Sequence, residues 1–347
     1  MDDAVAVVLF VAVTTYAVFG GADFGAGFWD LVAGGAARGA APRALVDHAI
    51  GPVWEANHVW LIFALVVLWT AFPEAFASIT LTAFVPLMLV ALGIVLRGAS
   101  FAFRKSLFRT SQRRAFGAIF AFSSVLVPYG MGAVAGAIAS GRVPAGGEAG
   151  DPWSSWINPT SVVGGVLAVT VGAYLAAVYL ISDARRLADD AMVDYFRRRA
   201  VAAAIIAGPV ALLGIVVLRS DARYLFDGLA SRALPLVLLS SLCGIGSLVL
   251  LLRRSPRGAR LLAMGAVASI IWAWGVAQWP YILPTSLEVA AAAAPQATLI
   301  TVLVVFGVAT VVILPSLGLL YFLDQRSLLP AEGLDALPPS RGSASLP

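Results

Sequence analysis

The composition of this chain excludes an ordinary soluble protein, because 60% of its 347 residues are hydrophobic and only 12% are charged, whereas a typical soluble domain has about 25% charged residues. Its formal net charge of +4 gives no reason to expect nucleic acid as a partner. The single cysteine, Cys243, excludes both a disulfide framework and a metal site built from cysteines.

Long apolar runs, separated by short clusters of charge, predict about nine membrane-spanning helices. An α-helix needs about 20 apolar residues to cross a bilayer, and runs of this length are too long for the strands of a membrane barrel. We therefore predict an all-α integral membrane protein with one helical bundle over residues 1–327 and a disordered tail over residues 328–347. In chain order, the predicted spans are 4–28, 49–71, 77–100, 114–139, 160–182, 200–218, 232–252, 259–280 and 297–323.

Arginine and lysine are concentrated in alternate loops, and this pattern predicts the orientation of the bundle. The loops after the first, third, fifth and seventh spans contain most of them, and only the segment 219–232 departs from the pattern. Because basic residues accumulate in cytoplasmic loops, we expect the N-terminus outside and the C-terminus in the cytoplasm. Residues 183–199 are predicted to form a separate amphipathic helix on the cytoplasmic surface.

Ionisable side chains within the predicted spans are the candidate functional residues, because charges inside a membrane are costly and usually serve a function. A rise of about 1.5 Å per residue puts Asp23, Glu55, His58 and Arg97 in the cytoplasmic halves of the first three spans, together with Asn57. We therefore expect one buried polar cluster that holds or relays protons. The alternative is a structural ion pair, with Arg97 extending its guanidinium to the membrane surface.

The spacing of Glu55 and His58 also fits the Glu-x-x-His motif of di-iron bundles, which puts both side chains on one face of a helix. Such a site needs a second copy of the motif, and the only other histidine, His48, lacks the neighbours to supply it. His48 and His58 lie about 15 Å apart along a helix and cannot share one haem. We therefore expect no metal site, while a haem held by His58 and a methionine stays open from the residues alone.

Several motifs resemble subunit II of the cytochrome bd family of quinol oxidases. Residues 20–27, Gly-Gly-Ala-Asp-Phe-Gly-Ala-Gly, resemble the family's Gly-Phe-Asp-(Leu/Met)-Gly-Val-Gly stretch. Residues 50–61, which include Trp54 and Trp60, resemble its more specific Ile-Gly-Pro-x-Trp-Asp-Gly-Asn-x-Val-Trp-Leu signature. The resemblance extends over nearly the whole chain, with later landmarks in the family's order at 71–73, 96–97, 157–159 and 280–286.

The resemblance implies a heterodimer with a haem-bearing subunit I in a prokaryotic plasma membrane. The partner would carry two haems b, one haem d and the quinol site, and the complex would oxidise quinol and reduce O₂ to water with protons from the cytoplasm. The resemblance leaves room for a structural quinone or lipid in the bundle and for a small single-helix accessory subunit. It also implies no catalytic residue, no haem ligand and no other bound cofactor in this chain itself.

The same resemblance assigns a proton path to this chain, because Glu55 stands where the family has an acidic residue that is thought to line such a path. We expect the path to involve Glu55, His58, Asp23 and Asn57. Residues that support the polar cluster are expected to be Arg97, Trp54 and Trp60.

Three residues of the signature depart from the family pattern and indicate a divergent branch. Glu55 replaces Asp, Ala56 replaces Gly, and His58 stands where the family has Gln or Glu. Glutamate keeps the carboxylate, and the histidine adds a group that titrates near neutral pH.

Two other functions stay open from the sequence: a secondary transporter, indicated by prolines within spans and by the buried charges, and a purely structural assembly subunit.

Overall fold

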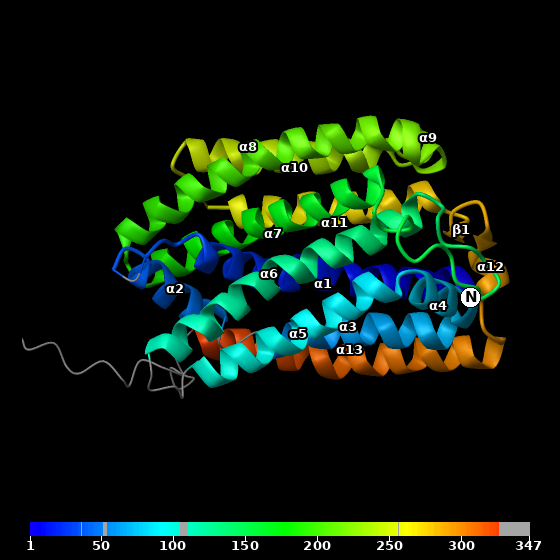
Figure 1. Cartoon of the computed structure of the whole chain (residues 1–347), viewed down its shortest axis with the longest axis horizontal. Helices are drawn as coiled ribbons and strands as arrows, with labels where there is room; N and C mark the ends of the chain where they lie inside the picture. The colour runs from blue at the N-terminus through cyan, green and yellow to red at the C-terminus, as the bar shows by residue number, and fades with distance from the viewer. Residues whose placement is uncertain (36, 51–53, 105–109, 256, 326–347) are drawn as a thin grey trace, which may run out of the picture.

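The apolar runs of the sequence form long helices that lie side by side in the computed structural model of the chain, which describes residues 1–35, 37–50, 54–104, 110–255 and 257–325 (Figure 1). The long helices are α1 (Asp2–Leu31), α3 (Trp54–Ala71), α5 (Phe84–Arg104), α6 (Thr110–Ala139), α7 (Pro159–Arg186), α8 (Asp190–Asp221), α10 (Leu234–Leu252), α11 (Ala259–Gln278) and α13 (Gln296–Gln325). The short elements are α2 (Ala40–Ile50), α4 (Pro73–Thr82), α9 (Arg223–Ala230), α12 (Val289–Ala292) and a hairpin of β1 (Tyr281–Leu283) and β2 (Leu287–Glu288).

Within the described part of the chain, eight helices are long and apolar enough to cross a membrane. The prediction of an all-α membrane protein is therefore confirmed, and each predicted span overlaps one of the long helices, although 49–71 begins at the end of α2 and 77–100 begins in α4. A ninth crossing results if α3 and α4, which are bent by 117° where they meet, are one broken span. The bend lies at Pro73, the first residue of α4, because a proline has no N–H to continue the hydrogen bonds of the preceding helix.

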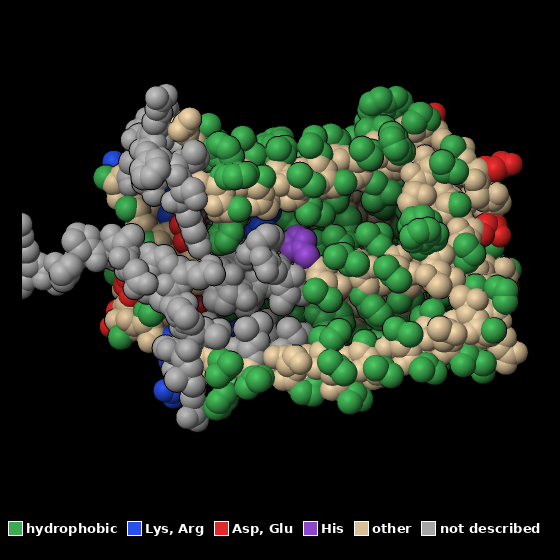
Figure 2. Space-filling model, turned by 90° about the horizontal axis from the view of Figure 1, so that it is seen from below, with side chains coloured by type: hydrophobic (Ala, Val, Ile, Leu, Met, Phe, Trp, Pro, Cys, Tyr) green, Lys and Arg blue, Asp and Glu red, His purple; other side chains and the backbone are tan. Residues whose placement is uncertain are grey.

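Hydrophobic side chains cover the outside of the bundle between two polar ends. Figure 2 shows this band on the face formed by α3, α5 and α13, with charged side chains gathered at both ends of the molecule. On these three helices, Trp69 of α3 is 64% exposed, Val95 of α5 66% and Val311 of α13 74%. An apolar surface of this extent is costly in water and favourable in lipid or against another membrane helix.

One end of the bundle is rich in arginine. The turns after α7 and α10 lie there, with Arg185, Arg186, Arg253 and Arg254, and we call it the arginine-rich end (Figure 1). The other end, where Met1 precedes α1, is the Met1 end. The predicted tail, residues 328–347, lies outside the described residues.

The prediction of a separate surface helix over residues 183–199 is wrong. The chain runs in α7 to Arg186, reverses within three residues and continues in α8 from Asp190. Ala188 takes the left-handed conformation, with φ of 53°, and the carboxylate of Asp189 accepts a hydrogen bond of 3.0 Å from the N–H of Met192, which caps α8. Both halves of the segment are helical, so their periodicity alone did not reveal the reversal.

Glycines allow the central helices to approach each other closely. A Cβ atom at Gly25 of α1 would overlap the backbone oxygen of Gly172 in α7. The same holds between α6 and α7, where a Cβ at Gly132 would overlap the backbone oxygen of Gly164. Contacts of this kind let helix backbones pack directly against each other in lipid, and they place α1 in the centre of the bundle.

We expect Gly25→Ala to destabilise the folded chain, because the added methyl group would force α1 and α7 apart. Overpacking of this kind typically costs about 1–3 kcal/mol. The matched control is Gly244→Ala in α10, since a Cβ there would meet nothing within 4 Å. Thermal unfolding of the purified protein in detergent should show a lower midpoint for Gly25→Ala alone. Equal midpoints for the two variants would contradict the close α1–α7 contact.

Candidate functional site

The buried polar cluster is built around Asp23, which lies on α1 in the half of the bundle near the arginine-rich end. Asp23 is 5% exposed, Asn57 of α3 is 4% exposed and Arg97 of α5 is 2% exposed. The Nδ2 of Asn57 donates a hydrogen bond of 2.5 Å to Oδ2 of Asp23. Arg97 donates from its terminal nitrogen to the backbone oxygen of Asp23 at 2.9 Å. The structure thus joins three of the predicted site residues from three consecutive long helices.

Arg97 does not extend to the membrane surface, so that part of the alternative interpretation is wrong. Its Nε donates to Oγ of Ser124 in α6 at 3.1 Å. Its guanidinium carbon lies 4.7 Å from the ring centre of Phe24 and 5.0 Å from that of Phe120. A guanidinium over aromatic faces gains cation–π attraction, which is strongest where water is excluded. These contacts stabilise a positive charge inside the bundle.

His58 lies next to the cluster on α3 and is half-buried. Its ring centre is 6.3 Å from that of Tyr16 and 6.1 Å from that of Phe24, in edge-on contacts. Trp60 packs against the apolar cluster that contains Tyr16 and Phe24. It also lines a small pocket of about 40 Å³ between α3 and α13, with Phe63 and residues of α13.

The other two predicted residues, Trp54 and Glu55, form the first turn of α3, but their side chains lie outside the described part of the structure. Their backbone positions precede Asn57 by less than one helical turn. Sequence reasoning missed Ser124 and Tyr16, which border the cluster from α6 and α1. Neither residue is unusual in an apolar run, so no sequence signal pointed to them.

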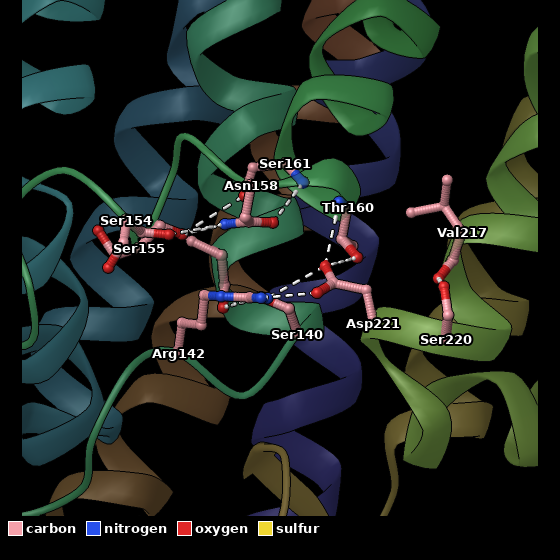
Figure 3. A network of polar contacts seen from close by, with 11 residues as sticks. Ser140, Arg142, Ser154, Ser155, Asn158, Thr160, Ser161, Val217, Ser220 and Asp221 are labelled. Carbon is pink, nitrogen blue, oxygen red and sulfur yellow. Dashed lines mark hydrogen bonds and ion pairs between the residues drawn. The ribbon is translucent and has the colours of Figure 1, made fainter.

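A second polar network ties the Met1 end together (Figure 3). Arg142 donates to both carboxylate oxygens of Asp221, at 3.1 and 2.6 Å. The hydroxyl and the N–H of Thr160, in the first turn of α7, also donate to this carboxylate, at 2.6 and 3.2 Å. Asp221 belongs to the segment 219–232 that departs from the charge pattern, and its carboxylate is paired with Arg142, which lies outside that segment.

The loop before α7 is capped by its own side chains. Asn158 accepts a hydrogen bond of 2.9 Å from the N–H of Ser161 and donates to the backbone oxygen of Ser155 at 2.7 Å (Figure 3). Nearer the start of the loop, hydrogen bonds from the N–H groups of Ser154 and Trp153 hold the pKa of Asp151 below its usual range. The landmark at residues 157–159 therefore has a local structural role as a helix cap.

Together these features define a class: a helical membrane protein with a buried carboxylate, amide and guanidinium in one half of its bundle. In the described residues, no group of three or more His, Cys, Asp and Glu side chains is arranged to hold a metal ion.

Comparison with known proteins shows the family. The profile of cytochrome bd terminal oxidase subunit II matches residues 1–323, so the chain belongs to this family. It is 23% identical over 277 residues to cytochrome bd ubiquinol oxidase subunit 2 of Bacillus subtilis (strain 168), covering 77% of each chain. Its fold is similar to that of a chain in the structure of bd oxidase from Geobacillus thermodenitrificans, with a TM-score of 0.78 and 23% identity over 93% of this chain and 98% of the other.

Membership of the family confirms the predicted resemblance to subunit II, and with it the membrane location and the partner subunit that the resemblance implied. The chain is a multi-pass protein of the plasma membrane and the non-haem subunit of a haem-containing oxidase. A cytochrome bd oxidase complex also contains a subunit I, which is the partner of this chain.

We expect Asp221→Ala to destabilise the Met1 end, because it leaves the guanidinium of Arg142 unpaired and removes the acceptor of Thr160. Arg142 is partly exposed, so water compensates for some of the loss, and the cost should be about 1–2 kcal/mol. Asp227→Ala is the matched control, because the pair of Arg223 and Asp227 is exposed and contributes less than about 1 kcal/mol. Proteolysis of the loop over residues 140–158 should accelerate only in Asp221→Ala, and equal rates in the two variants would contradict the network.

Proposed function

We propose that this chain holds the haem-bearing subunit I of a quinol:O₂ oxidoreductase and supplies a proton path from the cytoplasm to the site of O₂ reduction. The observation that carries the proposal is the buried carboxylate of Asp23 with its partners Asn57 and Arg97. An ionisable group at this depth is rarely kept in a membrane protein without a function.

The position of Asp23 suits the uptake of protons from the arginine-rich end. It precedes Leu31, the last residue of α1, by eight residues, which is about 12 Å along the helix. By the distribution of basic residues this end faces the cytoplasm, with the N-terminus outside. Glu55 belongs to the first turn of α3, nearer that end than Asn57, and is the group that we expect to pass protons on to Asp23.

Each described residue of the cluster then has a distinct task. Asp23 accepts a proton and releases it. The amide of Asn57 holds one oxygen of the carboxylate in a fixed direction, and the guanidinium of Arg97 holds the backbone of the same residue through its carbonyl oxygen. The reacting groups, which are two haems b, one haem d, quinol and O₂, belong to the partner in this proposal, so this chain handles protons only.

The apolar face of α3, α5 and α13 is the surface that we assign to the partner (Figure 2). A proton path that begins in this chain must continue in subunit I, so the partner has to contact the helices nearest the cluster. These are α3 and α5, which carry Asn57 and Arg97. The proposal leaves room for a small single-helix accessory subunit and for a structural quinone or lipid against the remaining apolar surface.

We expect Glu55→Gln and Asp23→Asn each to slow quinol-driven O₂ consumption by the purified complex at least about tenfold, because each removes a proton-accepting group from the path. Assembly with subunit I and the haem spectrum should stay unchanged. The matched control is Asp194→Asn in α8, which removes a carboxylate that is paired with Arg197 and lies on a different helix from the cluster.

Two other outcomes would favour the alternative functions, a purely structural subunit and a secondary transporter. Full turnover in both cluster variants, with normal assembly, would remove the proton path and leave a purely structural subunit. Proton or substrate flux by the isolated chain in liposomes would instead favour a secondary transporter.

A further inference from the structure

Tyr16 contributes a buried hydroxyl that no described side chain or backbone group satisfies. The residue is 9% exposed, and its Oη has no hydrogen-bond partner among the residues that the structure describes. Its ring packs in an apolar cluster with Phe24, Val90 and Val127. A buried hydroxyl without a partner is costly, and phenylalanine would fill almost the same volume without that cost.

A second buried tyrosine shows what a structural hydroxyl looks like in this bundle. Tyr174 of α7 is 8% exposed, and its hydroxyl donates a hydrogen bond of 2.6 Å to Oγ of Ser247 in α10. Ser247 in turn donates to the backbone oxygen of Ala259 at 2.8 Å. The hydroxyl of Tyr174 therefore links helices, whereas the hydroxyl of Tyr16 makes no such link within the described residues.

The side chain of Tyr16 is turned along α1 toward Asp23. A Cβ atom at Gly20, one turn further along the helix, would lie only 2.7 Å from the ring of Tyr16. The ring therefore occupies the space that any side chain at position 20 would need. Tyr16 and Asp23 are seven residues apart on α1, which is about two helical turns, so they share one face of the helix, with Tyr16 on the side away from the arginine-rich end.

On its other side, Tyr16 meets His58. The two ring centres are 6.3 Å apart. His58 is half-buried, and the next residue of α3, Val59, is 45% exposed on the apolar face that we assign to the partner. Tyr16 thus neighbours a histidine that borders the surface of the chain and shares a helix face with the buried carboxylate of Asp23.

We propose that the hydroxyl of Tyr16 is a further relay group of the proton path, connecting Asp23 to His58 through bound water. The oxygen of Tyr16 accepts a proton from the Asp23 side while its own proton leaves toward His58, so the phenol is neutral before and after each transfer. The imidazole of His58 then passes the proton toward subunit I, since one ring nitrogen can bind a proton while the other releases one. This inference rests on the proposed function.

The test is Tyr16→Phe in the purified oxidase complex, with Tyr174→Phe as the matched control. We expect Tyr16→Phe to slow O₂ consumption about tenfold and to increase the solvent deuterium isotope effect on turnover, with normal haem content. We expect Tyr174→Phe to lower the thermal midpoint, because it breaks the hydrogen bond to Ser247, and to leave turnover and the isotope effect unchanged.

Comparison with the Asp23→Asn variant separates a failure of this inference from a failure of the proton path. Normal turnover in Tyr16→Phe, together with slow turnover in Asp23→Asn, would overturn the role of Tyr16 and leave the path in place. Normal turnover in both would overturn both. If Tyr16→Phe does not assemble, difluorotyrosine at position 16 keeps the ring and changes only the acidity of the hydroxyl. A relay then predicts a changed turnover rate, and an unchanged rate would overturn it.

Discussion

The burial of Asp23 and Arg97 inside a membrane bundle is the constraint on which the arrangement of the first four long helices depends. Removing a charge from water costs several kcal/mol unless other groups compensate for the lost hydration. Here the compensation comes from different helices, because Asn57 lies on α3, Ser124 on α6 and Phe24 on α1. The polar groups meet only if all of these helices keep their depth and rotation. A site of this kind therefore specifies the packing as well as the chemistry.

Close backbone packing makes this convergence possible. Gly25 allows α1 to touch α7 directly, and two further neighbours of α1, the helices α3 and α6, both reach the cluster. At the Met1 end, the ion pair of Arg142 and Asp221 ties the loop before α7 to the end of α8. The two polar networks lie in opposite halves of the bundle, with apolar helix surface between them, and this is the arrangement that a membrane requires.

The meeting of Asp23, Asn57 and Arg97 could be predicted because depth in antiparallel spans follows from counting residues at a known rise. The rotation of each helix cannot be counted in this way, so the buried position of Arg97 and its partner Ser124 required the structure. Serine and tyrosine are ordinary residues of apolar runs, and nothing in the sequence separates Ser124 or Tyr16 from their neighbours. The reversal at Ala188 was missed because two helices joined by three residues keep a nearly continuous periodicity.

One departure of this chain from the family signature, His58, has a physical explanation in its contact with Tyr16. A glycine at position 20 leaves room for the ring of Tyr16 to turn toward Asp23, and a histidine at position 58 places a group that can bind and release protons next to that ring. A hydroxyl relays a proton only when it has an acceptor beyond it, and His58 is the neighbour that can serve as one. In this proposal the three residues act together: Gly20 provides the space, Tyr16 the hydroxyl and His58 the acceptor. Replacement of any one of them should then weaken the contribution of the other two.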